Sequence, residues 1–495
     1  MIFSSPRFFI FLATLLVLMA LLGKDRRESK KRLLGIASCL FYAAWDWRYL
    51  GLLLTISVVD YVAAAKISIS ANRSTRKAWL LLSIVSNLTI LGYFKYCNFF
   101  IDNLNGASAM FGWHINPLNI LLPAGISFYT FKTMSYTIDV YRGELKTCRS
   151  WLDYTTFITF FPELIAGPIV RGSVFLPQMN REIGPTLERL KIGFSIFLLG
   201  LTKKVLIADR LAGIADPIFK DPELYSGVSI WFGVLSYSLQ IYCDFSGYSD
   251  MAIGTAKMIG YDLPENFRMP YVSVNITEFW RRWHITLSTW LRDYLYVPLG
   301  GNRLGTQRTY INLMLTMLLG GLWHGASWNF VLWGGLHGLA LGIHKWVLSC
   351  RKQYSIPVLH PFVGGVATFI FVTLAWVPFR ATSFGDTLFM VQKMIGLGAD
   401  GGVAWIPAAF FWCLPMLVFG HVVGKLIEKD AVVAIGILRR GLGFFGLGMH
   451  SDSISGYYLI WNKASVPCLY VLFLWLLVLF FFASTNTSPF IYFQF

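Results

Sequence analysis

Long apolar runs separated by short polar segments are the main pattern of this chain. They occupy residues 8–22, 33–45, 49–67, 78–94, 120–141, 154–170, 228–242, 310–322, 329–348, 363–379, 405–423 and 466–482. The pattern predicts an all-α polytopic membrane protein with about 11 to 13 membrane segments, since each full span needs about 20 mostly apolar residues. No internal repeat and no boundary to a soluble domain is visible, so we expect one membrane domain over residues 1–495.

One apolar run contains residues that interrupt a helix. Residues 154–170 include Pro162, Glu163 and Gly167. Glu163 is either a functional acid within the membrane or the marker of a re-entrant turn. The neighbouring proline and glycine favour the turn, because non-helical backbone is tolerated at membrane depth only where protein or water covers it.

Two stretches are too polar to cross a membrane. Residues 190–211 are predicted to form an amphipathic helix with Lys203-Lys204 and Asp209-Arg210 on its polar side. Residues 260–309 combine tryptophans with arginines. This mixture is typical of amphipathic helices that lie at the membrane interface.

The composition supports a membrane protein. Of the 495 residues, 56% are hydrophobic and only 14% are charged, against about 25% charged in soluble domains. The net charge of +16 includes basic clusters at residues 24–32 and 73–77, which the positive-inside rule places in the cytoplasm. No nucleic-acid-binding module is visible, so nucleic acid is not an expected partner. The basic residues follow the first apolar run, which indicates a first transmembrane helix rather than a cleaved signal peptide.

The cysteines give no sign of a metal site. All seven are scattered, and none forms a Cys-X-X-Cys pair. This favours small buried side chains over disulfides or metal ligands. Phosphate-binding loops, nucleophile elbows and zinc spacings are also missing from the sequence, so no metal is expected.

Two histidines within residues 244–345 are candidates for catalysis. His284 lies in a polar, arginine-rich segment, whereas His324 follows an apolar run, where a polar group costs free energy unless it has a partner or a task. An imidazole can take a proton from a hydroxyl and return it later, which suits acyl transfer to an alcohol. The alternative is a packing role for both, and packing is the expected role of His337 and His344.

Neighbouring residues are candidates for binding an acyl donor. Arg281 and Arg282 can bind the phosphates of a coenzyme A-type donor by charge-assisted hydrogen bonds, with Trp283 beside them. The alternative for the arginines is an anchor on the cytoplasmic side of the membrane. Asp244 and Asp250 have no metal-like partners at a useful spacing, so we expect them to orient neighbouring groups.

Four motifs are specific enough to compare with known families. They are Phe245-Ser246-Gly247-Tyr248-Ser249-Asp250, Glu265-Asn266-Phe267, Glu278-Phe279-Trp280-Arg281-Arg282-Trp283-His284 and Gly320-Gly321-Leu322-Trp323-His324-Gly325. Together they resemble the membrane-bound O-acyltransferase family, and its alginate O-acetyltransferase branch in particular. The resemblance runs from residue 1 to about 345 and is most specific between residues 244 and 325.

The resemblance implies a fold and a site. The fold is a ring of transmembrane helices around a central passage, with interfacial and re-entrant helices, and residues 244–345 form its catalytic core segment. The catalytic residues implied are His324 and, as second histidine, His284. The supporting residues expected around them are Asp244, Tyr248, Asn266, Trp323 and Asn329.

The resemblance also implies a function. It is that of a multi-pass O-acetyltransferase of the bacterial inner membrane, which takes acetyl groups from a cytoplasmic donor, acetyl-CoA, for an exported polysaccharide such as alginate or cellulose. The expected partners are membrane lipid and an extracytoplasmic acetyltransferase or polymer-binding protein. Two alternatives stay open: a transporter or channel for acetyl groups, since broken apolar segments are typical of transporters, and a non-catalytic subunit of a polysaccharide modification complex. The histidine pair argues against both.

Overall fold

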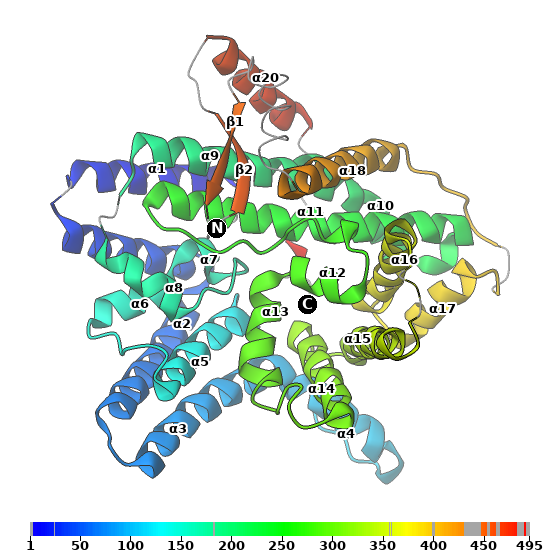
Figure 1. Ribbon diagram of the computed structural model, residues 1–495, viewed down its shortest axis with the longest axis horizontal. Helices are drawn as coiled ribbons and strands as arrows, with labels where there is room; N and C mark the ends of the chain where they lie inside the picture. The colour runs from blue at the N-terminus through cyan, green and yellow to red at the C-terminus, as the bar shows by residue number, and fades with distance from the viewer. Residues whose placement is uncertain are drawn as a thin grey trace. The chain divides into compact units, whose positions relative to one another are not determined.

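Helices make up nearly all of the protein, as Figure 1 shows. The computed structural model describes residues 3–23, 25–181, 184–355, 357, 359–397, 401–429, 447–452, 456–461, 466–482 and 490–491. The chain divides into two compact units. The first consists mainly of residues 1–197 and 249–264, and the second mainly of residues 198–248 and 265–495.

The first unit is built around α5, which is buried throughout residues 126–137 and packs against α2 and α3. Its elements are α1 (Pro6–Leu21), α2 (Arg27–Ile69), α3 (Arg73–Leu91), η1 (Gly92–Tyr96), α4 (Cys97–Ser108), η2 (Ala109–Phe111), α5 (Ile126–Arg142), α6 (Trp151–Thr159), α7 (Phe161–Leu164), α8 (Gly172–Phe175) and η3 (Leu176–Asn180). The first part of α9 (Leu187–Thr202) and the last part of α11 (Gly227–Ile259) also belong to it.

The polar residues between the apolar runs 33–45 and 49–67 form a kink in α2. Asp46 leaves helical geometry, with φ −157° and ψ 114°. Its carboxylate accepts hydrogen bonds from the backbone N–H and the guanidinium group of Arg48. The two runs are therefore one bent element of 43 residues.

The predicted turn within residues 154–170 is also present. The helix α6 ends at Thr159, and α7 adds only four residues before the chain turns at Gly167. A Cβ atom on Gly167 would lie 2.4 Å from the Cα atom of Glu163, so the turn needs glycine at this position. Glu163 itself is buried and forms an ion pair with Lys132.

The second unit holds the remaining helices and one small sheet. Its elements are η4 (Lys203–Ala208), α10 (Asp209–Lys220), η5 (Pro222–Leu224), most of α11, η6 (Pro270–Val272), α12 (Ile276–Arg282), α13 (Ile285–Leu291), η7 (Arg292–Tyr296), α14 (Thr306–His324), α15 (Trp328–Tyr354), α16 (Pro361–Arg380), α17 (Phe384–Met394), α18 (Ala408–Lys429), β1 (Leu447–Asp452), β2 (Gly456–Trp461) and α20 (Val466–Phe482). The strands pair with each other and are a small addition to the predicted all-α fold. The polar residues 260–309 contain the expected pair of short helices, α12 and α13.

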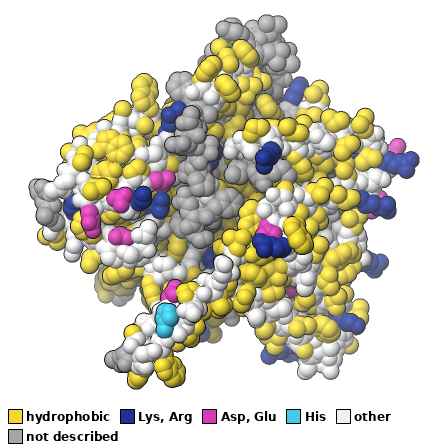
Figure 2. Space-filling model, turned by 180° about the vertical axis from the view of Figure 1, so that it is seen from behind, with side chains coloured by type: hydrophobic (Ala, Val, Ile, Leu, Met, Phe, Trp, Pro, Cys, Tyr) yellow, Lys and Arg dark blue, Asp and Glu magenta, His cyan; other side chains and the backbone are white. Residues whose placement is uncertain are grey.

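The surface suits a lipid environment. Among the described residues, the stretches long and apolar enough to cross a membrane are Arg27–Ile69, Arg73–Ser108, Pro361–Arg380 and Ala408–Lys429. Hydrophobic side chains cover much of the face seen in Figure 2, and Trp47, Trp113 and Trp412 are 75–77% exposed. Apolar area of this extent is unfavourable in water. The fold is therefore that of a polytopic membrane protein, while the number of spans stays a prediction.

Candidate functional site

A tight hairpin of α14 and α15 places His324 at the end of α14 (Figure 1). Two glycines let these helices approach backbone to backbone. A Cβ atom on Gly321 would lie 2.2 Å from the carbonyl oxygen of Phe330, and one on Gly334 would lie 2.2 Å from that of Met317. The two helix backbones thus approach closely at Gly321, and this packing holds His324 in place.

Aromatic rings surround the imidazole of His324, which is only 5% exposed. The ring centroids of Trp323 and Trp333 each lie 5.0 Å from the imidazole centroid, and that of Phe379 lies at 5.2 Å. Such surroundings keep water away and lower the local dielectric constant. Electrostatic interactions and hydrogen bonds made by this imidazole are therefore stronger than in water.

His284 lies in the break between α12 and α13, at the N-cap of α13. Its backbone has φ 41° and ψ 55°, in the left-handed region that few residues other than glycine adopt. The side chain is fully buried, and its ring centroid lies 4.7 Å from that of Phe245. The backbone at His284 is therefore somewhat strained, and this conformation turns the imidazole into the interior.

The hydrogen bonds of Asn266 fix the tautomer of His284. Asn266 Oδ1 accepts from the backbone N–H and the hydroxyl of Thr286, at 3.3 and 2.8 Å. His284 Nδ1 lies 3.1 Å from the same oxygen, so Nδ1 carries the proton and donates it, and Nε2 carries the lone pair. Burial lowers the pKa of His284 to about 3, because apolar surroundings disfavour the imidazolium ion. The ring is therefore neutral near pH 7.

Trp323 connects the two candidate catalytic histidines. Its ring centroid lies 5.0 Å from that of His324 and 6.2 Å from that of His284. Both imidazoles belong to the second unit and border the same indole ring. The structure thus brings together the two histidines that the sequence singled out.

The three candidate donor-binding residues have different surroundings. Arg281 is exposed. Arg282 forms ion pairs with Glu278 at 2.9 Å and with Glu428 at 2.8 Å, which hold α12 against the end of α18. Trp283 is only 2% exposed and packs among other aromatic rings. Of the three side chains, that of Arg281 is therefore the most available to a ligand.

Asp244 belongs to a buried cluster of charges. The Nζ atom of Lys204 lies 2.8 Å from Asp244 and 2.9 Å from Asp209. The prediction that Lys204 and Asp209 lie on the polar side of an amphipathic helix was wrong, because both are buried. Each is tolerated inside the protein since it finds an opposite charge there.

Residues near the end of the chain complete the surroundings of this cluster. The backbone N–H of Ile491 donates to Asp244 Oδ2 at 2.8 Å. The ring of Phe490 lies 4.5 Å from that of Tyr248 and 5.9 Å from that of Phe245, centroid to centroid. Because Phe245 also borders His284, these residues extend the aromatic layer of the site. No local pattern in the sequence marks this contact.

Asn329 and α16 close another side of the site. The Nδ2 group of Asn329 donates to the carbonyl oxygen of Ala381 at 3.0 Å, which ties the start of α15 to the end of α16. Trp376 of α16 lies 5.0 Å from Trp283 between ring centroids. The sequence predicted α16 as the apolar run 363–379, but not that the aromatic residues at the end of this run contact the site.

His337 and His344 both lie in α15, and their expected packing roles stay a prediction. His337 is fully buried, with ring centroids of Trp333 and Trp280 at 4.7 and 5.2 Å. His344 Nδ1 lies 2.8 Å from the hydroxyl of Thr277. Neither ring borders His284 or Trp323 in the contacts of the described part of the chain.

The arrangement of the two imidazoles suits proton transfer. No group of three or more His, Cys, Asp and Glu side chains able to hold a metal ion occurs within the described ranges. Two imidazoles in water-poor surroundings offer an acceptor for the proton of a hydroxyl and a hydrogen-bonding partner for a second reactant. These are the requirements of acyl transfer to an alcohol.

Proteins with similar sequences are named for acyl transfer. Residues 144–385, which include both histidines, match the model of the membrane-bound O-acyltransferase family. The chain is 41% identical to the probable alginate O-acetylase AlgI of Pseudomonas putida, over 100% of both chains. It is 46% identical to that of Pseudomonas aeruginosa, over 80% of this chain and 75% of the relative.

A relative with another printed substrate is the peptidoglycan O-acetyltransferase of Helicobacter pylori. It is 40% identical, over 74% of this chain and 73% of the relative. The chain therefore belongs to the membrane-bound O-acyltransferase family, in its alginate O-acetylase-like branch, and is an O-acyltransferase.

Proposed function

We propose that this enzyme takes acetyl groups from a cytoplasmic donor and delivers them across the inner membrane for the O-acetylation of an exported polysaccharide. The names of its relatives, alginate O-acetylase and peptidoglycan O-acetyltransferase, support an acetyl group and a glycan acceptor. The observation that carries the proposal is the placement of His324 and His284 against the same indole ring, that of Trp323, in a buried aromatic site.

His324 is the proposed general base. It takes the proton of the attacking hydroxyl while the hydroxyl oxygen forms a bond to the acetyl carbon. When the bond between that carbon and the donor sulfur breaks, the proton passes to the leaving thiolate, so the imidazole returns to its starting state. The aromatic rings around His324 favour this transfer, because they exclude water that would compete for the acetyl group.

His284 has a different proposed role, on the donor side of the site. Its pKa of about 3 makes it a weak base near pH 7. Because Nδ1–H is bound to Asn266, Nε2 is oriented to accept a hydrogen bond. We therefore assign His284 to the positioning of a reactant, with Asn266 holding the imidazole in the required tautomer.

The proposed donor is acetyl-CoA, and Arg281 is the first candidate for its phosphates. An exposed guanidinium group can form two parallel charge-assisted hydrogen bonds to a phosphate. Arg282 and Trp283, also predicted as donor-binding residues, would act by holding the segment that carries Arg281, through Glu278, Glu428 and the aromatic core.

The acceptor and the partner follow from the same proposal. Alginate is the first candidate acceptor because it is named for several relatives, and cellulose is the second. An extracytoplasmic acetyltransferase or polymer-binding protein would complete the transfer. Comparing acetyl incorporation into a uronic-acid polymer and into a neutral glucan in cells that make both would distinguish the two acceptors.

The change His324→Asn tests the catalytic assignment. Asparagine has a similar volume and can form hydrogen bonds, but it cannot accept a proton near pH 7. Acetyl transfer by the purified variant, with its partner present, should fall by about 10²–10⁴-fold, the usual contribution of general acid–base catalysis. Membrane level and thermal stability should change little.

His344→Asn, on the neighbouring helix and outside the aromatic site, is the matched control and should keep nearly full activity. A His324→Asn enzyme that acetylates at the wild-type rate would remove His324 from the mechanism. It would favour a transporter or a non-catalytic subunit instead.

A further inference from the structure

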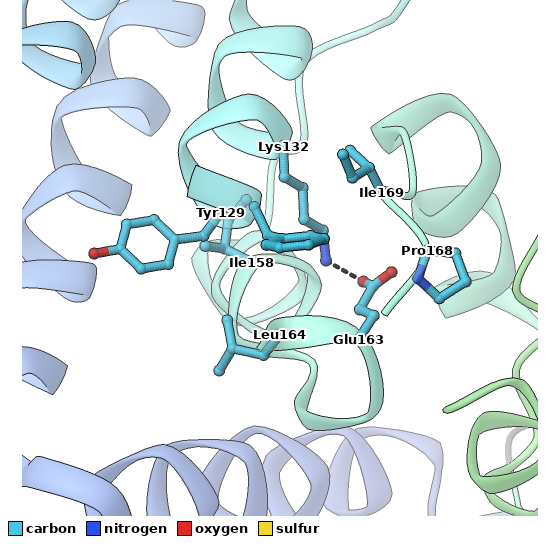
Figure 3. Close-up of a pocket in the computed structure, with 8 residues that line it drawn as sticks. Tyr129, Lys132, Ile158, Glu163, Leu164, Pro168 and Ile169 are labelled. Atoms are coloured by element: carbon cyan, nitrogen blue, oxygen red, sulfur yellow. Dashed lines mark hydrogen bonds and ion pairs between the residues drawn. The ribbon is translucent and has the colours of Figure 1, made fainter. Parts of the chain in front are cut away.

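A small pocket lies within the first unit, and none of its residues belongs to the histidine site. It is lined by Phe128, Tyr129, Lys132, Ile158, Glu163, Leu164, Pro168 and Ile169. Its empty volume, including the open mouth, is about 210 Å³. Figure 3 shows Lys132 of α5 and Glu163 of α7 pointing toward each other, with Pro168 and Ile169 beside them and the hydroxyl of Tyr129 pointing away.

The polar end of this pocket is a buried ion pair. The Nζ atom of Lys132 binds Oε1 of Glu163 and the carbonyl oxygen of Phe157. It also lies 4.4 Å from the centroid of the Phe157 ring. The two charged side chains are only 5% and 2% exposed. Withdrawing both charges from water is costly, and it is offset only if the remaining hydrogen-bonding positions are also satisfied.

One hydrogen-bonding position of this ion pair has no partner in the described part of the protein. Oε2 of Glu163 is buried and has no hydrogen-bond partner among the residues that the structure describes. A buried carboxylate oxygen without a donor is unfavourable, so a ligand that supplies a donor would stabilise the site. The ion pair has no net charge, so it does not attract an ion strongly enough to offset the ion's loss of hydration. The complementary ligand is a neutral hydrogen-bond donor.

The backbone around the pocket restricts the size of that ligand. A Cβ atom on Gly125 would lie 2.4 Å from the carbonyl oxygen of Leu164, so the start of α5 and the turn after α7 are in direct contact. The whole pocket is also small, since its empty volume of about 210 Å³ includes the open mouth. The polar end therefore accepts a single small group.

We propose that the pocket binds one hydroxyl group, of water or of a small neutral alcohol, which donates a hydrogen bond to Oε2 of Glu163. The apolar side chains of Phe128, Leu164 and Ile169 line the pocket and suit the short alkyl part of an alcohol. This is a second polar binding site, separate in its residues from the site of acyl transfer.

Two isomeric small molecules test whether the pocket binds an alcohol through its hydroxyl group. 1-Butanol has a hydroxyl donor, whereas methyl propyl ether has the same atoms and no donor. The thermal unfolding midpoint of the purified protein in detergent should be higher in butanol than in ether, by roughly 2 °C near saturation. Ile169→Phe fills the pocket, keeps the ion pair and should remove this difference. Ile69→Phe, at a position that is 76% exposed, should keep it.

A density map of the protein, determined without butanol or ether, tests whether a water molecule occupies the pocket. If butanol and ether act alike, the wild-type map should show a peak at about 2.8 Å from Oε2, and the Ile169→Phe map should lack it. If Ile169→Phe does not fold, the double change Lys132→Met and Glu163→Met replaces it, because it removes the ion pair and the acceptor together, with the same expectation. Equal midpoints in the two probes together with no peak in the wild-type map would overturn the proposal.

Discussion

At the scale of single residues, one amide distinguishes the surroundings of the two histidines. Oδ1 of Asn266 accepts a hydrogen bond from Nδ1–H of His284, and the amide carries no charge, so it orients the ring without stabilising an imidazolium ion. His324 lies instead among aromatic rings at the end of a helix. The surroundings of His284 favour a neutral imidazole, in agreement with the positioning role proposed for it.

The change Asn266→Asp should alter the pH dependence of the enzyme. A carboxylate beside Nδ1 stabilises the imidazolium ion and raises the pKa of His284 from its value of about 3. As the pH falls through the raised pKa, Nε2 takes a proton and no longer accepts a hydrogen bond. Activity of the variant should then fall by roughly tenfold per pH unit, while the wild type shows no such loss above pH of about 5. Initial rates of acetyl transfer by the variant and the wild type, measured from neutral pH down to about pH 5, show the effect.

Asn275→Asp is the matched control for this change. The side chain of Asn275 caps α12 by accepting the backbone N–H of Glu278, and aspartate caps a helix equally well. Its pH profile should follow that of the wild type. If Asn266→Asp also followed it, the neutral state of His284 would not be required for activity.

At the scale of elements, the contact between α14 and α15 controls the position of His324. Gly321→Ala places a methyl group 2.2 Å from the carbonyl oxygen of Phe330, so the helices must separate. We expect a loss of stability of about 1–3 kcal/mol from overpacking, seen as a lower unfolding midpoint, and a loss of acetyl transfer as well.

Gly335→Ala, on the same hairpin, provides the comparison. Its Cβ atom would meet only a side-chain carbon of Leu318 at 3.6 Å, an ordinary contact. Alanine also favours a helix by about 1 kcal/mol over glycine, so this variant should be as stable as the wild type or more so. Equal losses in the two variants would show that the close approach of the backbones is not the cause.

Elements defined by local signals were predictable from the sequence. The polar residues at Asp46 mark the kink of α2, and Pro162 with Gly167 marks the turn after α7. The helix pair α12 and α13 follows from the polar, aromatic character of residues 260–309. Each of these features depends on residues only a few positions apart.

Contacts between distant residues were not predictable in the same way. We expected Lys204 to be solvated, because a charged residue beside other charged residues normally faces water. Its partner Asp244 lies on a different helix, so the local sequence does not reveal the ion pair. Ile491 meets Asp244 across 247 positions of sequence. Burial of such groups depends on which elements come together, and hydrophobic periodicity carries no information about that pairing.

At the scale of the whole molecule, the distribution of charge sets the orientation in the membrane. The basic cluster at residues 73–77 begins the apolar stretch Arg73–Ser108, which is long enough to cross the bilayer. The positive-inside rule places Arg73 in the cytoplasm and Trp113, beyond the other end, outside. Trp113 is 76% exposed, so a label can reach this position.

Cysteine labelling of intact cells tests this orientation. In a chain without its native cysteines, Trp113→Cys should react with a membrane-impermeant maleimide added from outside. Arg73→Cys should react only after the inner membrane is opened, because moving the basic cluster across the bilayer is unfavourable. Efficient labelling of Arg73→Cys in intact cells would reverse the proposed topology.

The left-handed backbone of His284 has a consequence for substitution experiments. Alanine is disfavoured at φ 41°, whereas asparagine adopts this region more readily. A variant with alanine would combine the loss of the imidazole with a change in the chain path between α12 and α13. An alanine scan would therefore overstate the chemical contribution of this side chain. Comparing His284→Ala with His284→Asn would separate the loss caused by the changed backbone from the loss caused by removing the imidazole.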